Sequence, residues 1–543
     1  MRIKPIDLEN SNQLVQDYLD TQSEIHSFFD YRPSDADEKR LADLRERSFQ
    51  RDKLVQVLHK MNIAWDAPRE TLDQIERLKD GESVVVIGGQ QAGLLTGPMY
   101  TVNKVISILK LAKEKEAGLN VPVIPVFWIA GEDHDYDEIN HIFSRSDNKL
   151  YKHATTQQLY FKQPISSVEI DKEKTLQWIE RAFHDLKETQ HTKKLYESIA
   201  SCLHESASYV DFFARLIFRL FPNQGLVLID SAHPDVRCLE KEGFEKLIAN
   251  QPAISKSVYE TVQRLNQKGY ALSLEAEEDD AHLFYHDSNN ERILLKREGS
   301  HWIGKNDEVK LTTDELLRIA QSEPERLSNN VVTRPIMQEL LFPTLAFIGG
   351  HGEISYWAAL KGAFNAFDET FKVPPVLPRI SMTYITGRIE KLLEARVVEP
   401  DDIINNGIEA KKLNWLMSQV TPPVEQLFEG AKQGFDQHHK PLRQLAASIS
   451  ADLGEESEKN FQFIQNQLAY LEHRMMLKLE EKFANELAQY DEIGQQLKPN
   501  EVLQERVWNP LPLLNEYGTQ FIDALLQEES LSFFHDHFLI YLD

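Results

Sequence analysis

Three stretches of this 543-residue chain place glycines and polar side chains directly after predicted strands. The first, SVVVIGGQQAGLLTGPMYTVNK, runs from Ser83 to Lys104 and passes from an apolar run through glycines and two glutamines into a helix-like segment. It has neither a G-x-G-x-x-G dinucleotide motif nor a Walker A loop, because Leu94 stands where the Walker lysine belongs. Backbone N–H groups at such a turn can hold an anion or a ribose-phosphate, and the glutamines suit uncharged polar groups.

A purely structural interpretation of this stretch is equally consistent with its pattern. The glycines could simply allow a tight turn and close packing of the backbone. If the turn binds a ligand, the candidate residues are Gly89, Gln90, Gln91, Gly93, Thr96 and Gly97.

The second stretch, AGEDHDYDEIN (130–140), gathers acidic side chains and a histidine after the next apolar run. Carboxylates in this position could bind an amine, act as a general base or hold a divalent metal. We expect no metal, because the H-x-E and H-E-x-x-H spacings are absent. The predicted catalytic residues are Asp133, His134 and Asp135, and the two aspartates should favour the protonated imidazole. The alternative is that the acids only decorate a helix N-terminus.

The third stretch, AFIGGHGEISYWAALKGAF (346–364), repeats the order strand, glycines, helix. Its candidate binding residues are Gly349, Gly350, Glu353 and Tyr356. Two arginines beside prolines flank it, Arg334 and Arg379. An arginine held next to a rigid, extended residue could clamp a carboxylate. The alternative is that both arginines pair with the excess acid of the chain.

Four short, nearly continuous apolar runs indicate the elements that position these stretches. They cover residues 83–89, 121–131, 225–230 and 344–350. Strands that are apolar on both faces and alternate with helices indicate a buried parallel sheet in a doubly wound α/β core. Because such sheets bind ligands at the carboxyl ends of their strands, we expect the three stretches to converge on one pocket.

This core is predicted to span residues 1–380, with amphipathic helices over its first eighty residues. Insertions are expected at about 145–220, which is rich in helix signals, and at about 240–330. Within the second insertion, alternating apolar and polar residues predict strands over 270–310. A capping box from Thr312 to Glu315 predicts the start of a helix.

Residues 381–503 are predicted to form an all-α domain built on an antiparallel coiled coil. Heptad-like seams cover 424–449 and 461–475, and Gly454 is the expected turn between them. Pro441 should kink or split the first helix. An apolar stripe that drifts around the second helix could contact both its hairpin partner and a second chain, as in a homodimer. Packing of the hairpin on its own core domain is the alternative.

The C-terminal segment, residues 504–543, is expected to dock back on the core. The part QERVWNPLPLLNEYG (504–518) is too apolar for a free end. Arg506, Trp508 and Tyr517 could line a second nucleotide pocket by charge and stacking, although their apolar surroundings favour core packing.

The composition excludes several classes of function. A formal net charge of −26 argues against nucleic acid as the main partner, since phosphates would be repelled on average. Two cysteines without disulfide or zinc spacing indicate a reducing compartment. The polar N-terminus and the short apolar runs predict a cytoplasmic protein without a membrane partner.

Taken together, these stretches resemble the BshC family, the proposed cysteine-adding enzymes of bacillithiol biosynthesis. The matching segments are GQQAGLLTGPMYTVNK (89–104), PVFWIAGEDHDYDEIN (125–140), GLVLIDSAHPDVR (225–237), NNVVTRPIMQELLFPTLAFIGGHGEISYWAALK (329–361) and VPPVLPRIS (373–381). Their order and spacing agree over essentially the whole chain. One departure is His351, where members of the family often carry proline.

The resemblance implies a Rossmann-like core with connecting-peptide insertions and a coiled-coil domain used for dimerisation. It also implies a ligase that joins L-cysteine to the glucosamine amine of glucosaminyl-malate, the last step of bacillithiol biosynthesis. ATP or ADP could take part, because a carboxylate must be activated before an amine can attack it. Relatives of this fold class use an H-x-G-H turn for adenylation. Residues 90–93 take that place here without a histidine, so adenylation does not follow.

Two other functions stay open from the residues alone. One is a nucleotidyltransferase or another ligase that acts on a different small carboxylic acid. The other is a non-enzymatic, nucleotide-binding coiled-coil protein, against which the three polar glycine junctions argue. In the ligase, the acceptor amine must lose a proton, for which His134 or Asp135 is the natural base. Arginines would suit the two malate carboxylates.

Overall fold

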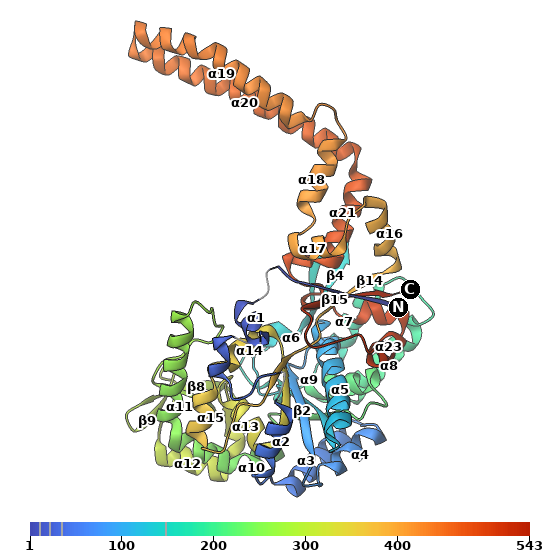
Figure 1. The fold of residues 1–543 in the computed structure, drawn as a ribbon, viewed down its shortest axis with the longest axis vertical. Helices are drawn as coiled ribbons and strands as arrows, with labels where there is room; N and C mark the ends of the chain where they lie inside the picture. The colour runs from blue at the N-terminus through green and yellow to red at the C-terminus, as the bar shows by residue number, and fades with distance from the viewer. Residues whose placement is uncertain (10–11, 21–22, 34–35, 147–148, 543) are drawn as a thin grey trace.

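The computed structural model describes residues 1–9, 12–20, 23–33, 36–146 and 149–542. Its centre is a five-stranded sheet with the order β13-β12-β2-β3-β6, in which every neighbouring pair is parallel (Figure 1). The strands are β2 (Val84–Gln90), β3 (Val123–Ile129), β6 (Val227–Asp230), β12 (Thr344–Gly349) and β13 (Val376–Pro378). The four strands expected from the apolar runs are confirmed. The fifth strand, β13, has three residues and neighbouring prolines, and was not predicted.

Helices cover both faces of this sheet, as the doubly wound prediction requires. Helix α5 (Tyr100–Leu119) follows β2 after a turn that contains a short 3-10 helix (Leu94–Thr96), and it is buried along most of its first three turns. The other helices of the first part of the chain and of the segment around β12 are α1 (Gln13–Leu19), α2 (Asp37–Arg45), α3 (Arg51–Ala64), α4 (Arg69–Arg77), α13 (Thr333–Leu341), α14 (His351–Trp357) and α15 (Lys361–Phe367). The strand β1 (Arg2–Ile6) precedes them, and sequence patterning did not indicate it.

Two insertions interrupt the core. The first contains α6 (Tyr136–Ile139), β4 (His141–Ser146), β5 (Lys149–Ala154), α7 (Lys172–His184), α8 (Thr192–Glu205) and α9 (Tyr209–Leu220). The second contains α10 (Pro234–Leu239), α11 (Lys241–Gln267), β7 (Asp280–His286), β8 (Arg292–Glu298), β9 (His301–Gly304), β10 (Lys310–Thr312), α12 (Thr313–Ser322) and β11 (Leu327–Asn329). Its strands form an antiparallel sheet, which confirms the strands predicted over 270–310.

The capping box at the start of α12 is also confirmed. The Thr312 hydroxyl accepts a hydrogen bond from the Glu315 N–H at 3.2 Å, and the Glu315 carboxylate accepts one from the Thr312 N–H at 2.8 Å. Two N–H groups at the helix end are thereby satisfied by side chains.

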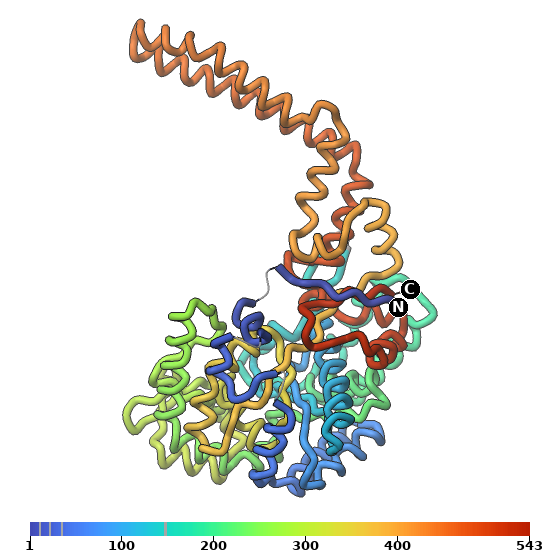
Figure 2. The backbone as a smooth tube through the Cα atoms, viewed as in Figure 1, coloured from blue at the N-terminus to red at the C-terminus, as the bar shows by residue number. Residues whose placement is uncertain are grey.

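The C-terminal part carries a long helical hairpin that projects away from the core (Figure 2). The C-terminal part contains β14 (Met382–Thr386), α16 (Gly387–Arg396), α17 (Pro400–Asn406), α18 (Glu409–Ser418), α19 (Val424–Ile449), α20 (Ala451–Lys482), α21 (Ala484–Leu497), α22 (Leu511–Tyr517), α23 (Gln520–Gln527) and β15 (His537–Leu542). The antiparallel pair α19 and α20 confirms the predicted coiled-coil hairpin.

One detail of the hairpin prediction is wrong, and of the two outcomes expected at Pro441 the split is excluded. The turn lies at Ser450, whose extended backbone separates the two helices and whose side chain caps α20. Gly454 lies inside α20, where a Cβ atom would stand 3.1 Å from Ala447, so the glycine serves close helix packing. Pro441 does not split α19, which runs unbroken through it.

The predicted seam of α19 faces its partner helix only in its first half. Phe435 stacks on Phe461 of α20 with ring centroids 5.9 Å apart. The inward positions then continue through His439, which contacts Asn460, while Leu442, Leu445 and Ile449 are 59, 60 and 67% exposed. An apolar-only rule missed the polar interface residues and therefore assigned the wrong face.

The C-terminal segment docks on the core, as predicted. Strand β15 lies between β1 and β14 in a three-stranded sheet. The Trp508 carbonyl accepts a hydrogen bond from the Met99 N–H at 2.8 Å, and the Asn509 amide donates to the carbonyls of Leu95 and Gly97. These bonds tie the segment to the turn between β2 and α5. Among the helices described, none combines the length and apolarity that a bilayer span needs.

Candidate functional site

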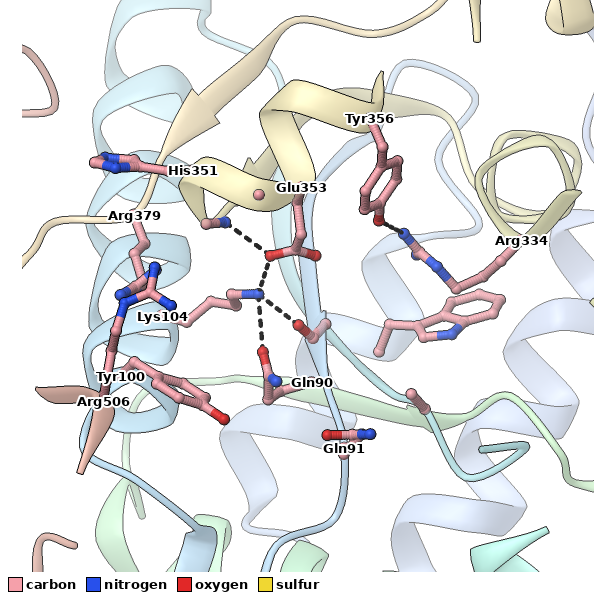
Figure 3. Close-up of a pocket in the computed structure, with 15 residues that line it drawn as sticks. Gln90, Gln91, Tyr100, Lys104, Arg334, His351, Glu353, Tyr356, Arg379 and Arg506 are labelled. Atoms are coloured by element: carbon pink, nitrogen blue, oxygen red, sulfur yellow. Dashed lines mark hydrogen bonds and ion pairs between the residues drawn. The ribbon is translucent and has the colours of Figure 1, made fainter. Parts of the chain in front are cut away.

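A cavity of about 340 Å³ opens at the carboxyl ends of β2, β12 and β13 (Figure 3). Its walls come from five separated parts of the chain. The lining residues are Gly89, Gln90, Gln91, Tyr100, Lys104, Trp128, Ala130, Arg334, Gly350, His351, Gly352, Glu353, Tyr356, Arg379 and Arg506. The first and third stretches singled out in the sequence thus meet at one edge of the sheet.

The turn after β2 contributes to the cavity only through its first half. Gly89, Gln90 and Gln91 line it. Gly93 and Gly97 instead lie against each other, since a Cβ on Gly93 would stand 2.8 Å from the Gly97 Cα and Gly97 has φ +72°. For these two glycines the structural interpretation of the turn is the better one. Thr96 is buried and lines a different cavity, beside α8 and α22.

Lys104 stands at the centre of the cavity, and sequence reasoning missed it. Its ammonium group donates to the Gly89 carbonyl at 2.6 Å, to Gln90 Oε1 at 3.2 Å and to Glu353 Oε2 at 2.5 Å (Figure 3). The side chain is 1% exposed, and burial lowers its pKa from the ordinary lysine value. The signal was present, because Lys104 interrupts an otherwise buried, mainly apolar run at the start of α5.

Glu353 is held in place from two sides. Its Oε2 accepts a hydrogen bond from the Gly350 N–H at 2.7 Å, in addition to its contact with Lys104. The predicted residue Gly350 therefore acts through its backbone, as the start of α14. Gly349 lies beneath the cavity wall, where a Cβ would meet the Cβ of Glu353 at 3.2 Å.

Arg334 and Tyr356 form a pair on the opposite wall, where the Arg334 guanidinium donates to the Tyr356 hydroxyl at 3.1 Å. Arg334 also donates to Gln338 Oε1 at 3.2 Å, and it has no carboxylate ion pair with any residue that the structure describes. It lies in the first turn of α13, not in extended backbone as expected before a proline. Its charge is thus available to a ligand.

Arg379 follows the acid-pairing alternative, because its guanidinium contacts Glu505 Oε1 at 2.5 Å. Its neighbour in the cavity, Arg506, comes from the C-terminal segment. The three residues proposed for a second nucleotide pocket do not gather in one place. Arg506 lines this cavity, Trp508 lines another one beside β4 and α7, and Tyr517 packs against the core and donates to the Leu542 carbonyl.

The acidic stretch lies beside the cavity and is linked to it by Gln91. The Gln91 amide donates to Asp133 Oδ2 at 2.6 Å and to Glu138 Oε2 at 2.7 Å. Asp133 also lies 3.8 Å from the Arg292 guanidinium. Asp135 is exposed and 3.9 Å from His134. The cluster therefore offers carboxylates at the edge of a cationic pocket.

The expectation of a protonated His134 is wrong. Burial lowers the pKa of His134, and the positive charge of Arg292 lowers it further, which outweighs Asp135 and Asp133. Its Nδ1 lies 3.1 Å from Arg292 Nη1. A guanidinium can only donate, so Nδ1 must accept, and the lone pair of the neutral imidazole is engaged. No local pattern in the sequence indicates that β8 brings an arginine to this point.

The cavity carries a net positive charge, in contrast to the chain as a whole. Lys104 and three arginines line it. Glu353 pairs with Lys104, and Glu505 behind the wall pairs with Arg379, so that Arg334 and Arg506 supply the excess charge. His351 adds no charge near neutral pH, because burial and the nearby Arg379 lower its pKa. In the described ranges no group of three or more His, Cys, Asp and Glu side chains is arranged to hold a metal ion. The arrangement is suited to a ligand with carboxylate or phosphate groups.

Comparison with known proteins assigns the chain to a family. Residues 1–380 match "Bacillithiol biosynthesis BshC, N-terminal Rossmann-like domain", and residues 382–542 match the C-terminal coiled-coil domain of the same family. A protein of Oceanobacillus iheyensis named "Putative cysteine ligase BshC" is 38% identical over the full length of both chains. Proteins of the same name from Bacillus cytotoxicus and Halalkalibacterium halodurans are 41% and 40% identical, over 97% of this chain and 98% and 97% of theirs. The chain therefore belongs to the BshC family of bacillithiol biosynthesis.

Proposed function

We propose that this protein is the ligase that joins the carboxyl group of L-cysteine to the glucosamine amine of glucosaminyl-malate, completing bacillithiol. The observation that carries the proposal is the cationic cavity of Lys104, Arg334, Arg379 and Arg506 at the carboxyl edge of the sheet, in a chain of net charge −26. The acceptor carries two carboxylates on its malate half, and the cysteine carries one. The relatives are named "Putative cysteine ligase BshC", which supports cysteine as one of the two substrates.

The cationic side of the site is suited to the substrate carboxylates, and the acidic side is suited to the acceptor amine. Arg334 and Arg506 have charge to offer to carboxylates, and Lys104 is fixed beside them by Glu353. The acceptor amine would approach Asp133 and Glu138, where the Gln91 amide now donates to both carboxylates. An amine there would lose its proton to a carboxylate and attack the activated cysteine carboxyl carbon, and the phosphate or nucleotide group that ATP had placed on that carboxyl would leave. Gln91 lines the cationic cavity and also bonds to these carboxylates, which keeps the cysteine carboxyl group and the acceptor amine close together.

The cysteine carboxylate needs activation before the amine can attack it. We propose ATP as the activating co-substrate, since an amide does not form freely from a carboxylate and an amine in water. The phosphates of a nucleotide would also suit the cationic cavity. The direct test in cells is the thiol content of a strain that lacks this protein. Accumulated glucosaminyl-malate without bacillithiol supports the proposal, and normal bacillithiol levels rule it out.

Asp133 is the proposed base, and the change Asp133→Asn should lower kcat about 30-fold. His134→Gln should lower kcat less than about fivefold, because the imidazole lone pair already accepts from Arg292. Asp135→Asn is the matched comparison, since the Asp135 side chain is exposed and lies 3.9 Å from His134. Steady-state rates with saturating cysteine and acceptor show whether Asp133 or His134 is the base. A larger loss in the His134 variant than in the Asp133 variant would identify the imidazole as the base.

We also propose that the protein is a homodimer through the outer face of the hairpin. Leu442, Leu445 and Ile449 on α19 are exposed there, as are Phe463 and Tyr470 on α20. Apolar residues at this density on a long projecting hairpin are typical of a contact surface. Phe461 and Leu468 are half-buried on the inner side, so they are unsuitable for testing this surface.

Light scattering should give about twice the 62.8 kDa chain mass at micromolar concentration. Changing Leu442, Leu445 and Ile449 to glutamine should give the monomer mass. The control changes Gln437 and Gln444, which are exposed on the same helix, to alanine and should leave the dimer intact. A wild-type protein that elutes at the monomer mass would contradict the proposal.

A further inference from the structure

A buried carboxylate from the C-terminal segment lies directly behind the cavity. Glu505 is 0% exposed, although it belongs to a segment more than 120 residues away in sequence from its partners. Its Oε1 contacts the Arg379 guanidinium at 2.5 Å and accepts from the Ser381 hydroxyl at 2.6 Å. Its Oε2 accepts from the Asn103 amide at 2.6 Å. A buried charge that is satisfied this fully stays ionised, because Arg379 and these donors hold the pKa of Glu505 below its ordinary value despite burial.

Arg379 is fixed at the cavity wall by this carboxylate. Its guanidinium lies against Gly350, where a Cβ would stand 2.9 Å from Nη1, and over the ring of Tyr100 at 5.5 Å. The buried Nε has no hydrogen-bond partner in the part of the chain that the structure describes. An arginine that lines the cavity and is held from behind by a buried acid is oriented for a planar anion such as a carboxylate.

Two neighbouring residues of α5 connect this arrangement to the centre of the cavity. Asn103 binds Glu505, and Lys104 binds Glu353. The next residue after Glu505, Arg506, itself lines the cavity. The ion pair of Arg379 and Glu505 is therefore the point where three parts of the chain meet. These parts are α5, the end of β13 and the C-terminal segment.

We propose that Glu505 is a positioning residue, which fixes Arg379 for a carboxylate of the substrate, so that the C-terminal segment completes the site built by the Rossmann-like domain. This inference rests on the proposed function of the cavity. Glu505 itself touches no substrate. Its effect on the reaction passes through Arg379, and the two residues should behave as one unit.

A double-mutant cycle in the full-length protein tests this coupling. Arg379→Gln should lower kcat/KM for ligation about 50-fold and Glu505→Gln about 20-fold. The double variant should lose about 50-fold, not the product of the two losses. Glu505→Asp keeps the charge but shortens the side chain, and should lose about fivefold only when Arg379 is present. This second variant serves if Glu505→Gln folds poorly.

Two controls separate positioning from stability. Ser381→Ala removes another hydrogen-bond donor to Glu505 and gives the fall in melting temperature that a weakened network causes by itself. Glu516→Gln, on the exposed face of α22, should change neither the melting temperature nor kcat/KM. Losses of Glu505→Gln and Arg379→Gln that multiply in the double variant would overturn the inference, as would a Glu505 variant that changes only the melting temperature.

Binding of L-malate, measured by calorimetry, gives a readout that does not depend on ligation. The wild type should bind malate, and both Arg379→Gln and Glu505→Gln should weaken binding about tenfold or more. If the wild type binds malate but forms no bacillithiol, the proposed function fails while the positioning role is still measured. Unchanged malate binding in both variants would overturn the positioning role alone.

Discussion

Replacing Lys104 with methionine should lower kcat/KM for ligation by about 300-fold, or about 3 kcal/mol. Methionine keeps the length of the buried stem, so the main change is loss of the ammonium group. That group donates to the Gly89 carbonyl, to Gln90 and to Glu353 at the centre of the cavity. Without it, Glu353 keeps its bond from the Gly350 N–H but faces the ligand as an unpaired negative charge. An anionic substrate would then be repelled where it should be held.

The matched control is Lys113→Met, on the exposed side of the same helix. It should leave kcat/KM within about twofold of the wild type. Both variants should melt as cooperatively as the wild type, since Glu353 is 24% exposed in the ion pair and stays hydrated. A Lys104 variant that folds normally and ligates at more than about a tenth of the wild-type rate would show that the lysine only packs the core.

Arg334→Gln should raise the KM for glucosaminyl-malate by about 100-fold, with kcat reduced far less. Arg334 makes no ion pair with a described carboxylate, so its charge is free to bind the malate half of the acceptor. Loss of a charge-assisted, two-point contact with a carboxylate is worth about 1.5–3 kcal/mol. Glutamine can still bond to Tyr356 and Gln338, so the wall of the cavity should be retained.

Varying the concentrations of glucosaminyl-malate and cysteine separately shows which of the two substrates Arg334 contacts. An increase confined to the KM of glucosaminyl-malate places its malate half at Arg334, and an increase confined to the KM of cysteine reverses the assignment. Arg318→Gln, on the exposed helix α12, is the control and should change neither constant. Equal kinetics of the Arg334 variant and the wild type would remove Arg334 from the site.

The scaffold of the site could be predicted from the sequence because it rests on local patterns. Continuous apolar runs identify the four longer strands of the sheet, and the rule for parallel sheets places Gln90 and Gly350 at one edge. Strand β13 escaped prediction because three residues between prolines carry too little pattern. The outer face of α19 was misassigned because His439 and Arg443, which contact α20, occupy inward positions that an apolar rule leaves empty.

The charges of the site could not be predicted, because they depend on contacts between distant parts of the chain. The pKa of His134 is lowered first by burial and then by Arg292, which β8 brings to it from 158 positions away. Arg379 and Arg334 look alike in sequence, yet Glu505 neutralises only the first. Lys104 was the one residue with a local signal, a buried cation in an apolar helix, and a helix pattern alone does not say what such a cation faces.

The most direct test is ligation by the purified protein. It should convert L-cysteine and glucosaminyl-malate to bacillithiol in the presence of ATP, detected by mass spectrometry as a thiol product. The Lys113→Met control should form it at the wild-type rate, and Lys104→Met should form almost none. Folded wild-type protein that forms no bacillithiol with ATP or any other nucleoside triphosphate, from substrates shown to be intact, would contradict the account.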